Sequence, residues 1–311
     1  MADNSVPDNS VPANSVPADS RAELWAAGPP AGSWRRYLVA DVFTASPLQG
    51  NQLGVFPDGR GLDGALMQRT ARELNLSETV FFLPSEQGCD ARVRIFTPVG
   101  ELPFAGHPVL GSAFVLGDLL GTARVSLQTG LGPVPVELER DGERVVFGRM
   151  EQPIPVPEPF DRVAELLAAL GLSGSGLPVE AYRNGPRHVY VELASEAEVA
   201  GLSPDFRGLA DLQIGVSCFA GHGASWKTRM FAPFHGVYED PATGSAAGPL
   251  AVHLARHGRI GFGEEIEIRQ GEEIGRPSLL YARAEGTADR IERVLVGGSA
   301  VIVARGEYLL G

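Results

Sequence analysis

Two short stretches of the sequence combine residues that could hold a small anion with residues that could move a proton. Residues 238–258 read YEDPATGSAAGPLAVHLARHG, in which Asp240 leads through small residues into a helical pattern. Residues 102–116 repeat this order, with Gly106 directly before His107. Small residues let a ligand approach the free N–H groups of a helix's first turn, so each stretch is expected to bind a carboxylate or phosphate. Taken singly, each stretch is equally compatible with an ordinary capped helix.

Two such helix N-termini facing each other across a cleft would clamp a small anionic molecule, with Gly244 and Ser245 lining one side. His107 and Asp240 would then supply one titratable group from each side. The pattern also predicts Ser245 as the N-cap of its helix, Pro249 within the first four helical positions and Gly258 as the stop.

Glu78 is the candidate general base. It lies between Leu76 and the apolar run at 80–83, at the edge of an apolar wall where partial desolvation favours a carboxyl group that can take up and release a proton. The local sequence alone favours the alternative, a solvated glutamate at the start of a strand. Asn51 follows a glycine and could reach a ligand, although such an asparagine more commonly makes an Asx turn.

The hydrophobic periodicity predicts the elements that would position these side chains. Strands are predicted at 37–44, 55–56, 79–83, 92–97, 124–128, 134–139, 145–149, 188–193, 226–231, 266–270, 279–285, 290–296 and 300–305, and helices at 62–74, after His107, at 162–170 and after Ser245.

The order of strand, acid-bearing loop and glycine-preceded helix occurs twice, on either side of a segment with four prolines in ten residues, 150–159. The sequence therefore predicts an α+β protein of two related domains with a cleft between them. The first is expected at 34–149 plus a final strand at about 294–311, and the second at 150–293.

Composition bounds the function. A formal charge of −12 and a pI near 5.0 argue against a nucleic-acid surface. No run of about 18 apolar residues predicts a membrane span, and no secretory signal is evident. Two cysteines give no disulfide framework, so we expect a cytoplasmic protein. Residues 1–33 repeat NSVP three times and are predicted to form a disordered tail without a catalytic role.

At this point several motifs taken together resemble the PhzF family of phenazine-biosynthesis isomerases. The resemblance is collinear from about residue 37 to the C-terminus. It is carried by DVFTASPLQGN, ARELNLSETVFF, RVRIFTPVGELPFAGHPVLG, MEQPIP, NGPRHVYVEL, TRMFAPFHGVYEDPATGSAAGPLAVHLARHG and GEEIGRPSL.

The resemblance implies a diaminopimelate epimerase-like fold, in which each of two similar domains wraps a barrel-like sheet around a central helix. It implies isomerisation of trans-2,3-dihydro-3-hydroxyanthranilate, a small anionic cyclic amino acid, with a proton moved from C3 to C1. It also implies a homodimer without cofactor or metal, which passes its product to later enzymes of phenazine assembly.

Carried over by position, the resemblance implies that Glu78, in NLSE, is the catalytic acid and base. His107 in GHP and Asp240 in ED are implied to hydrogen-bond the substrate's amine and hydroxyl and to assist proton movement. Four further positions are implied to hold the substrate carboxylate or line its site: Ser77, Gly106, Gly244 and Ser245.

The sequence disfavours other chemistries. Neither Cys89 nor Cys218 lies in the two helix motifs, so a racemase with two catalytic thiols is not expected. His253 and His257 are spaced as metal ligands on a helix, but no third ligand is evident, and a surface pair or a helix-end charge is the prediction. Two alternatives stay open: an isomerase or epimerase of another small amino or hydroxy acid, and a catalytically silent binding protein.

Overall fold

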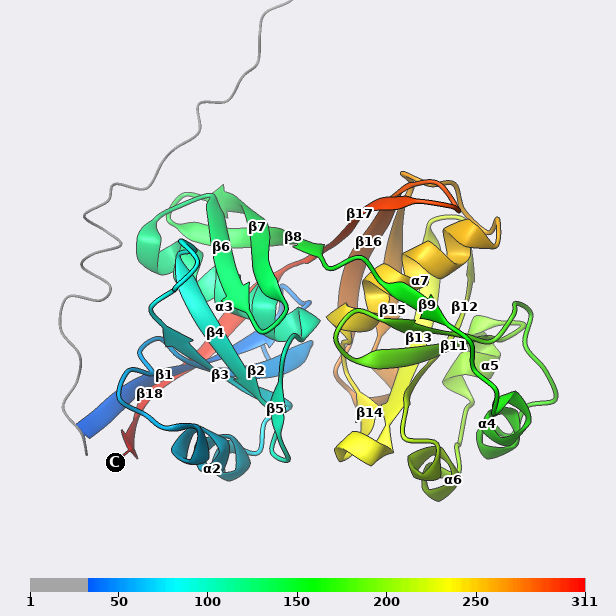
Figure 1. The fold of residues 1–311 in the computed structure, drawn as a ribbon, viewed down its shortest axis with the longest axis horizontal. Helices are drawn as coiled ribbons and strands as arrows, with labels where there is room; N and C mark the ends of the chain where they lie inside the picture. Colours follow the sequence, from blue (N-terminus) through cyan, green and yellow to red (C-terminus); the bar gives the residue numbers. More distant parts are fainter. Residues whose placement is uncertain (1–32, 311) are drawn as a thin grey trace, which may run out of the picture.

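The computed structural model describes residues 33–310, so the NSVP-repeat tail predicted at 1–33 lies outside the described residues except for its last residue. The described chain forms two halves that lie side by side (Figure 1). The first half contains β1 (Ser33–Val42), β2 (Asn51–Phe56), α2 (Gly64–Leu74), β3 (Glu78–Leu83), β4 (Ala91–Phe96), β5 (Glu101–Leu102), α3 (Gly106–Leu120), β6 (Arg124–Thr129), β7 (Gly132–Asp141), β8 (Arg144–Gln152) and β18 (Ala300–Leu310).

The second half begins within the proline-rich segment, part of which forms the short strand β9. It contains β9 (Val156–Glu158), α4 (Val163–Leu170), β10 (Glu180–Arg183), β11 (Arg187–Glu192), α5 (Glu196–Ala200), α6 (Phe206–Asp211), β12 (Gly215–His222), β13 (Ser225–Ala232), η1 (Pro233–His235), β14 (Val237–Asp240), α7 (Gly244–Arg256), β15 (Glu265–Gln270), η2 (Glu272–Ile274), β16 (Ser278–Gly286) and β17 (Ile291–Gly298).

The sheet continues from one half to the other. β8 pairs antiparallel with β17, and the chain then crosses back so that β18 pairs with β1 along almost the whole length of that strand. The first half is therefore completed by the last strand described.

Each half wraps its sheet around one buried helix. In α3, Val109, Leu110 and Ala113 have no exposed surface, and in α7 the same is true of Ala251 and Leu254. A helix that is apolar or small on every side must be covered on every side, and the curled sheets provide this cover. Among the described helices, none is both long enough and apolar enough to cross a bilayer.

The start of α7 differs from its prediction. The helix begins at Gly244, so Thr243 rather than Ser245 occupies the N-cap position, and Pro249 lies deeper than the first four positions. The Thr243 hydroxyl donates to Asp240 instead of capping the helix. The predicted stop is close to the observed one, because α7 ends at Arg256 and Gly258 follows with a φ of 69°.

The N-termini of α3 and α7 touch. A Cβ atom placed on Gly106 would lie 2.4 Å from both the carbonyl carbon of Gly244 and the amide nitrogen of Ser245. Only glycine allows this approach, so the contact between the two central helices depends on the missing side chain at position 106.

We expect Gly106→Ala to force the two helix ends apart, because both colliding atoms belong to the backbone. Overpacking of this kind costs about 1–3 kcal/mol in unfolding free energy. Gly174→Ala is the matched control, since a Cβ there meets no atom within 4 Å. Urea unfolding of both variants measures the difference, and equal stabilities would contradict the contact.

Candidate active site

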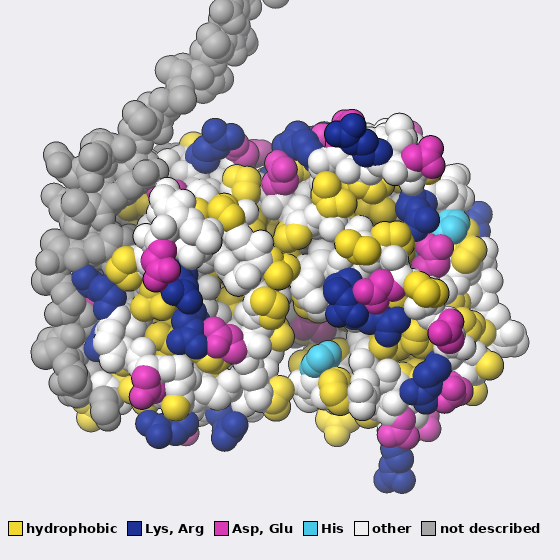
Figure 2. Space-filling view, in the orientation of Figure 1, with side chains coloured by type: hydrophobic (Ala, Val, Ile, Leu, Met, Phe, Trp, Pro, Cys, Tyr) yellow, Lys and Arg dark blue, Asp and Glu magenta, His cyan; other side chains and the backbone are white. Residues whose placement is uncertain are grey.

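A cleft of about 610 Å³ lies between the two halves, a size suited to a small ligand. It is lined by every residue predicted to act in catalysis or binding except Asn51: Ser77, Glu78, Gly106, His107, Asp240, Gly244 and Ser245. On the face shown in Figure 2 the surface is hollowed between the halves, and basic and acidic side chains are interspersed rather than gathered into a basic stripe.

Different elements bring the three predicted catalytic side chains together. Glu78 is the first residue of β3, which pairs in parallel with β2. His107 lies in the first turn of α3, and Asp240 is the last residue of β14 in the other half. Three element ends thus meet at one cleft: the start of β3, the start of α3 and the end of β14.

The carboxylate of Glu78 contacts the imidazole of His107. Glu78 Oε2 lies 3.0 Å from His107 Nε2, and the side chains are 14% and 5% exposed. Both groups are therefore largely shielded from water, where charge interactions are strong. A carboxylate held this way at the edge of the cleft can accept a proton from a bound ligand, with the imidazole beside it to stabilise the charge.

Asn51 lies behind the cleft rather than in it. Its side chain is fully buried, and its Nδ2 donates at 2.9 Å both to Asp240 Oδ1 and to the carbonyl oxygen of Ala242. The same nitrogen is 3.2 Å from His107 Nδ1. Both hydrogens of this amide are already donated to Asp240 and Ala242, so the contact with His107 positions the ring without fixing which ring nitrogen carries a proton. Asn51 thus orients both partners from opposite halves.

Two carboxylates and one imidazole share this site, and each affects the others. Burial raises the pKa of Asp240, with the nearby charge of Glu78 adding to the effect, to about 6. Burial opposes the charged form of His107, but Glu78 and Asp240 together outweigh it and raise the pKa of that imidazole. Asp240 can therefore take up and release a proton close to neutral pH, as general acid–base chemistry requires.

Gln270 and Thr243 form a second set of hydrogen bonds that holds Asp240 in place. Gln270 Nε2 donates to the backbone carbonyl of Asp240 at 2.7 Å and to the hydroxyl of Thr243 at 3.0 Å. The backbone N–H of Thr243 donates to Gln270 Oε1 at 3.2 Å. Sequence reasoning missed Gln270, because nothing in the pattern of β15 distinguishes it from an ordinary strand residue.

The two helix N-termini that the sequence suggested as an anion site are in contact with each other. Gly106, Gly244 and Ser245 all belong to first turns, whose N–H groups have no partner within their own helix. Ser245 adds a hydroxyl, which lies 3.1 Å from Nε2 of His188. His188 was predicted only as the start of a strand, although it lies in NGPRHV, one of the motifs that carried the family resemblance.

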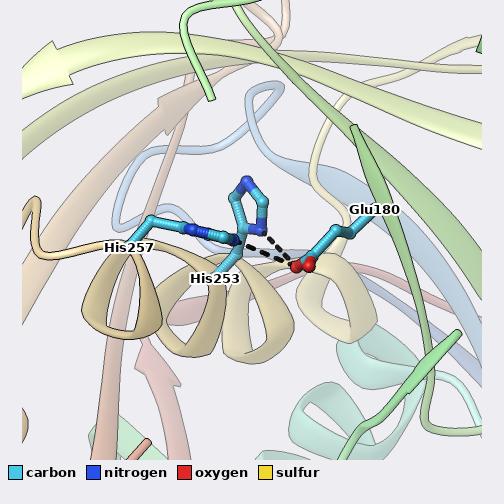
Figure 3. Close-up of side chains that lie close together, drawn as sticks. All are labelled: Glu180, His253 and His257. Carbon is cyan, nitrogen blue, oxygen red and sulfur yellow. Dashed lines mark hydrogen bonds and ion pairs between the residues drawn. The ribbon is translucent and has the colours of Figure 1, made fainter. Parts of the chain in front are cut away.

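The two histidines at the end of α7 have a third neighbour that the sequence did not reveal. Figure 3 shows His253 and His257 pointing toward Glu180 of β10, which meets them at 3.4 and 3.1 Å. The prediction of a surface pair is wrong for His253, which has no exposed surface. A helix pattern cannot show which distant strand covers it.

Three groups of this spacing could ligate a metal ion, but the surrounding charges disfavour one. Arg256 lies 3.4 Å from the same Glu180 oxygen, and the Tyr182 hydroxyl donates to it at 2.8 Å. Hydrogen bonds from His253, Tyr182 and His257 hold the pKa of Glu180 well below its usual range. The guanidinium of Arg256 already provides a positive charge beside the Glu180 carboxylate, and it would repel an added metal ion.

The two cysteines do not contribute to the cleft. Cys218 is buried, Cys89 is partly exposed, and neither lines the cavity. Burial also raises the pKa of the Cys218 thiol above its usual range. Chemistry with a pair of thiolates has no support in this site.

Comparisons with known proteins agree on one family. The model of the phenazine biosynthesis-like protein family, PhzC-PhzF, matches residues 40–306. The chain is 56% identical over 276 residues to the trans-2,3-dihydro-3-hydroxyanthranilate isomerase of Pseudomonas aeruginosa, covering 88% of this chain and 99% of that protein.

Solved structures show the same fold. A PhzF-family phenazine biosynthesis protein from Bacillus anthracis superposes with a TM-score of 0.78 at 24% identity, covering 89% of this chain and 100% of that one. A probable proline racemase from Agrobacterium radiobacter gives a TM-score of 0.64 at 14% identity, covering 89% and 93%. The predicted epimerase-like α+β fold is confirmed.

The raised pKa of Asp240 predicts how stability depends on pH. The folded protein keeps a proton on Asp240 up to about pH 6, whereas the unfolded chain releases it near 3.8. Stability should therefore fall as the pH rises between these values, by on the order of 1–3 kcal/mol relative to Asp240→Asn. Urea unfolding at a series of pH values measures this difference.

The test is how the difference in unfolding free energy between the wild type and Asp240→Asn changes with pH. Hydrogen bonds lost in Asp240→Asn add a constant to this difference and do not affect its slope. Asp289→Asn removes an exposed carboxylate and should run parallel to the wild type. A wild type that gains stability over this range relative to Asp240→Asn would show that the pKa is lowered instead.

The charge balance at Glu180 predicts that metal removal has no effect. Excess EDTA should leave both the melting temperature and the turnover rate unchanged, and zinc should not raise the melting temperature. His257→Gln, which removes one of the three potential ligands, is the matched variant. A melting temperature that rises with zinc in the wild type and not in this variant would reveal a metal site there.

Proposed function

Because the chain belongs to the PhzC-PhzF family of phenazine biosynthesis-like proteins, we propose that it isomerises trans-2,3-dihydro-3-hydroxyanthranilate in its central cleft, with Glu78 as acid and base. The observation that carries the mechanism is the pairing of Glu78 with His107 beside two touching helix N-termini. This arrangement offers a proton acceptor and an anion site within one small cavity.

The reaction needs one proton to move between two ring carbons. In the substrate the double bonds lie between C4 and C5 and between C6 and C1. Breaking the C3–H bond leaves an electron pair that shifts both double bonds along the ring, and the proton returns at C1. The product is an enol at C3, which tautomerises to the amino ketone.

Glu78 takes the proton from C3 and gives it back at C1. The two carbons are separated by a single ring atom, so one carboxylate on one face of the ring can reach both. His107 donates from Nε2 to Glu78 while the carboxylate is ionised, and this hydrogen bond turns to the substrate once Glu78 has taken up the C3 proton. Asp240 and His107 hydrogen-bond the amine and hydroxyl, which fixes the ring over Glu78.

The helix N-termini stabilise the charge that develops during proton removal. C1 carries the substrate carboxylate, so the electron pair delocalises onto that group before the proton returns. N–H donors of Gly106, Gly244 and Ser245 aimed at the carboxylate bind it more strongly as its charge grows, which lowers the barrier. Ser77, beside the base, lines the same wall of the cleft.

The protein's own groups suffice for each of these steps, so we propose a reaction without organic cofactor or metal. We further propose a cytoplasmic homodimer that releases its reactive amino ketone to later enzymes of phenazine assembly. The family resemblance supports these last proposals.

Glu78→Gln tests the role of the base. The wild type should consume the diene absorbance of dihydrohydroxyanthranilate in heavy water and incorporate deuterium into the product. The amide cannot accept the C3 proton, so we expect turnover to fall by about 10²–10⁴-fold. Glu73→Gln, an exposed glutamate on α2, is the control and should keep full activity.

Two outcomes would contradict this assignment separately. A wild type without turnover on this diene removes the proposed substrate, and the related small amino or hydroxy acids become the next to assay. Turnover by Glu78→Gln close to that of wild type removes Glu78 from its role while leaving the substrate in place.

A further inference from the structure

We propose that His188 is a positioning residue that turns the hydroxyl hydrogen of Ser245 toward the substrate carboxylate. This inference rests on the proposed function only in taking the ligand of the cleft to be a ring carboxylate. The strength of the anion site would then depend on a side chain from β11 that lines the same cleft and acts through the hydroxyl of Ser245.

The position of His188 is fixed by close packing. It lies in β11 opposite Gly215 of β12 and is 5% exposed. A Cβ atom on Gly215 would lie 2.8 Å from His188 Nδ1 and 2.6 Å from the terminal carbon of Met230. The imidazole therefore lies directly against a bare strand backbone and a methionine, and a rotated ring would lose this fit.

The protonation state of the ring follows from its two nitrogens. Burial, with a smaller contribution from His235, lowers the pKa of His188 to about 3, so the imidazole is neutral at the pH of any assay. Nδ1 is buried without a hydrogen-bond partner, whereas Nε2 lies 3.1 Å from Ser245 Oγ. A buried N–H without an acceptor is rarer than a buried lone pair without a donor, so the proton belongs on Nε2.

This tautomer determines what the serine can do. With Nε2–H donating to Oγ, the lone pair that faces His188 is occupied and the serine hydrogen must point elsewhere. Ser245 lines the cleft from the first turn of α7, where its own N–H has no partner within the helix. The hydroxyl and the N–H can then donate together to one carboxylate, and donor chains of this kind strengthen each bond.

Two substitutions separate the hydrogen bond from the bulk of the ring. His188→Gln can place an amide N–H where Nε2 lies, whereas the shorter His188→Asn ends near the depth of Nδ1 and cannot reach Ser245. The probe is 3-hydroxyanthranilate, the aromatic ring with the same carboxylate, amine and hydroxyl, whose Kd is measured by calorimetry. Melting temperatures confirm that each variant is folded.

We expect His188→Asn to weaken binding of the probe by about five- to tenfold, and His188→Gln to stay within about twofold of wild type. The decisive comparison is made in a Ser245→Ala background. Because His188 acts through the hydroxyl, His188→Asn should there change the Kd by less than about twofold, giving strongly non-additive effects.

If His188→Asn weakens binding by the same factor in the wild type and in Ser245→Ala, the inference is overturned. Such a result would mean that His188 acts by itself or through general packing. Equal losses in His188→Gln and His188→Asn would overturn it as well. A wild type that does not bind the probe would remove the carboxylate site and the role of His188 with it. Binding of the probe without turnover of the diene would refute the proposed function alone, and the binding cycle would still decide the role of His188.

Discussion

The contact between the N-terminal ends of α3 and α7 is the constraint on which the rest of the molecule depends. Each end carries the positive pole of a helix dipole, and two such poles in contact repel each other unless an anion lies between them. Packing of the curled sheets holds the ends together at Gly106, whose lack of a side chain makes the approach possible. The contact therefore favours negative charge between the two helix ends, and this is why we propose that the substrate carboxylate binds there.

The same site must also tolerate two carboxylates of its own. Glu78 and Asp240 come from opposite halves and would repel each other in a water-poor cleft, which is reflected in the raised pKa of Asp240. His107 contacts Glu78, and Asn51 contacts both His107 and Asp240, so one buried amide connects the groups from the two halves. A network that shares protons among three groups is suited to moving one proton within a substrate, because no group needs to be fully charged at every step.

The sequence predicted which side chains lie together where a residue type has few structural roles, as glycine at the start of a helix does. The residues predicted from two similar motifs line one cleft. They are a glycine at the start of a helix, the histidine after it and an aspartate shortly before a second such helix. Local pattern was insufficient where the answer depends on a distant segment. The local sequence suggested a solvated strand residue for Glu78 and a surface residue for His253, and it gave no signal for Gln270 or His188. The partners of these side chains come from helices and strands that are distant in the sequence. The α7 N-cap was misplaced for a local reason, because the helix begins at Gly244 and the hydroxyl of Thr243 donates to Asp240, three residues earlier, instead of capping the helix.

The pairing of β18 with β1 has a consequence for how the chain reaches its native state. During synthesis β1 can pair with β2 soon after both are made, but its other edge stays unpaired until β18 has been made, after the whole second half. The first half cannot mature independently of the second, and an open strand edge persists while the ribosome completes the second half. Folding of the first half is therefore completed only when β18, made after the second half, pairs with β1, which was made before it.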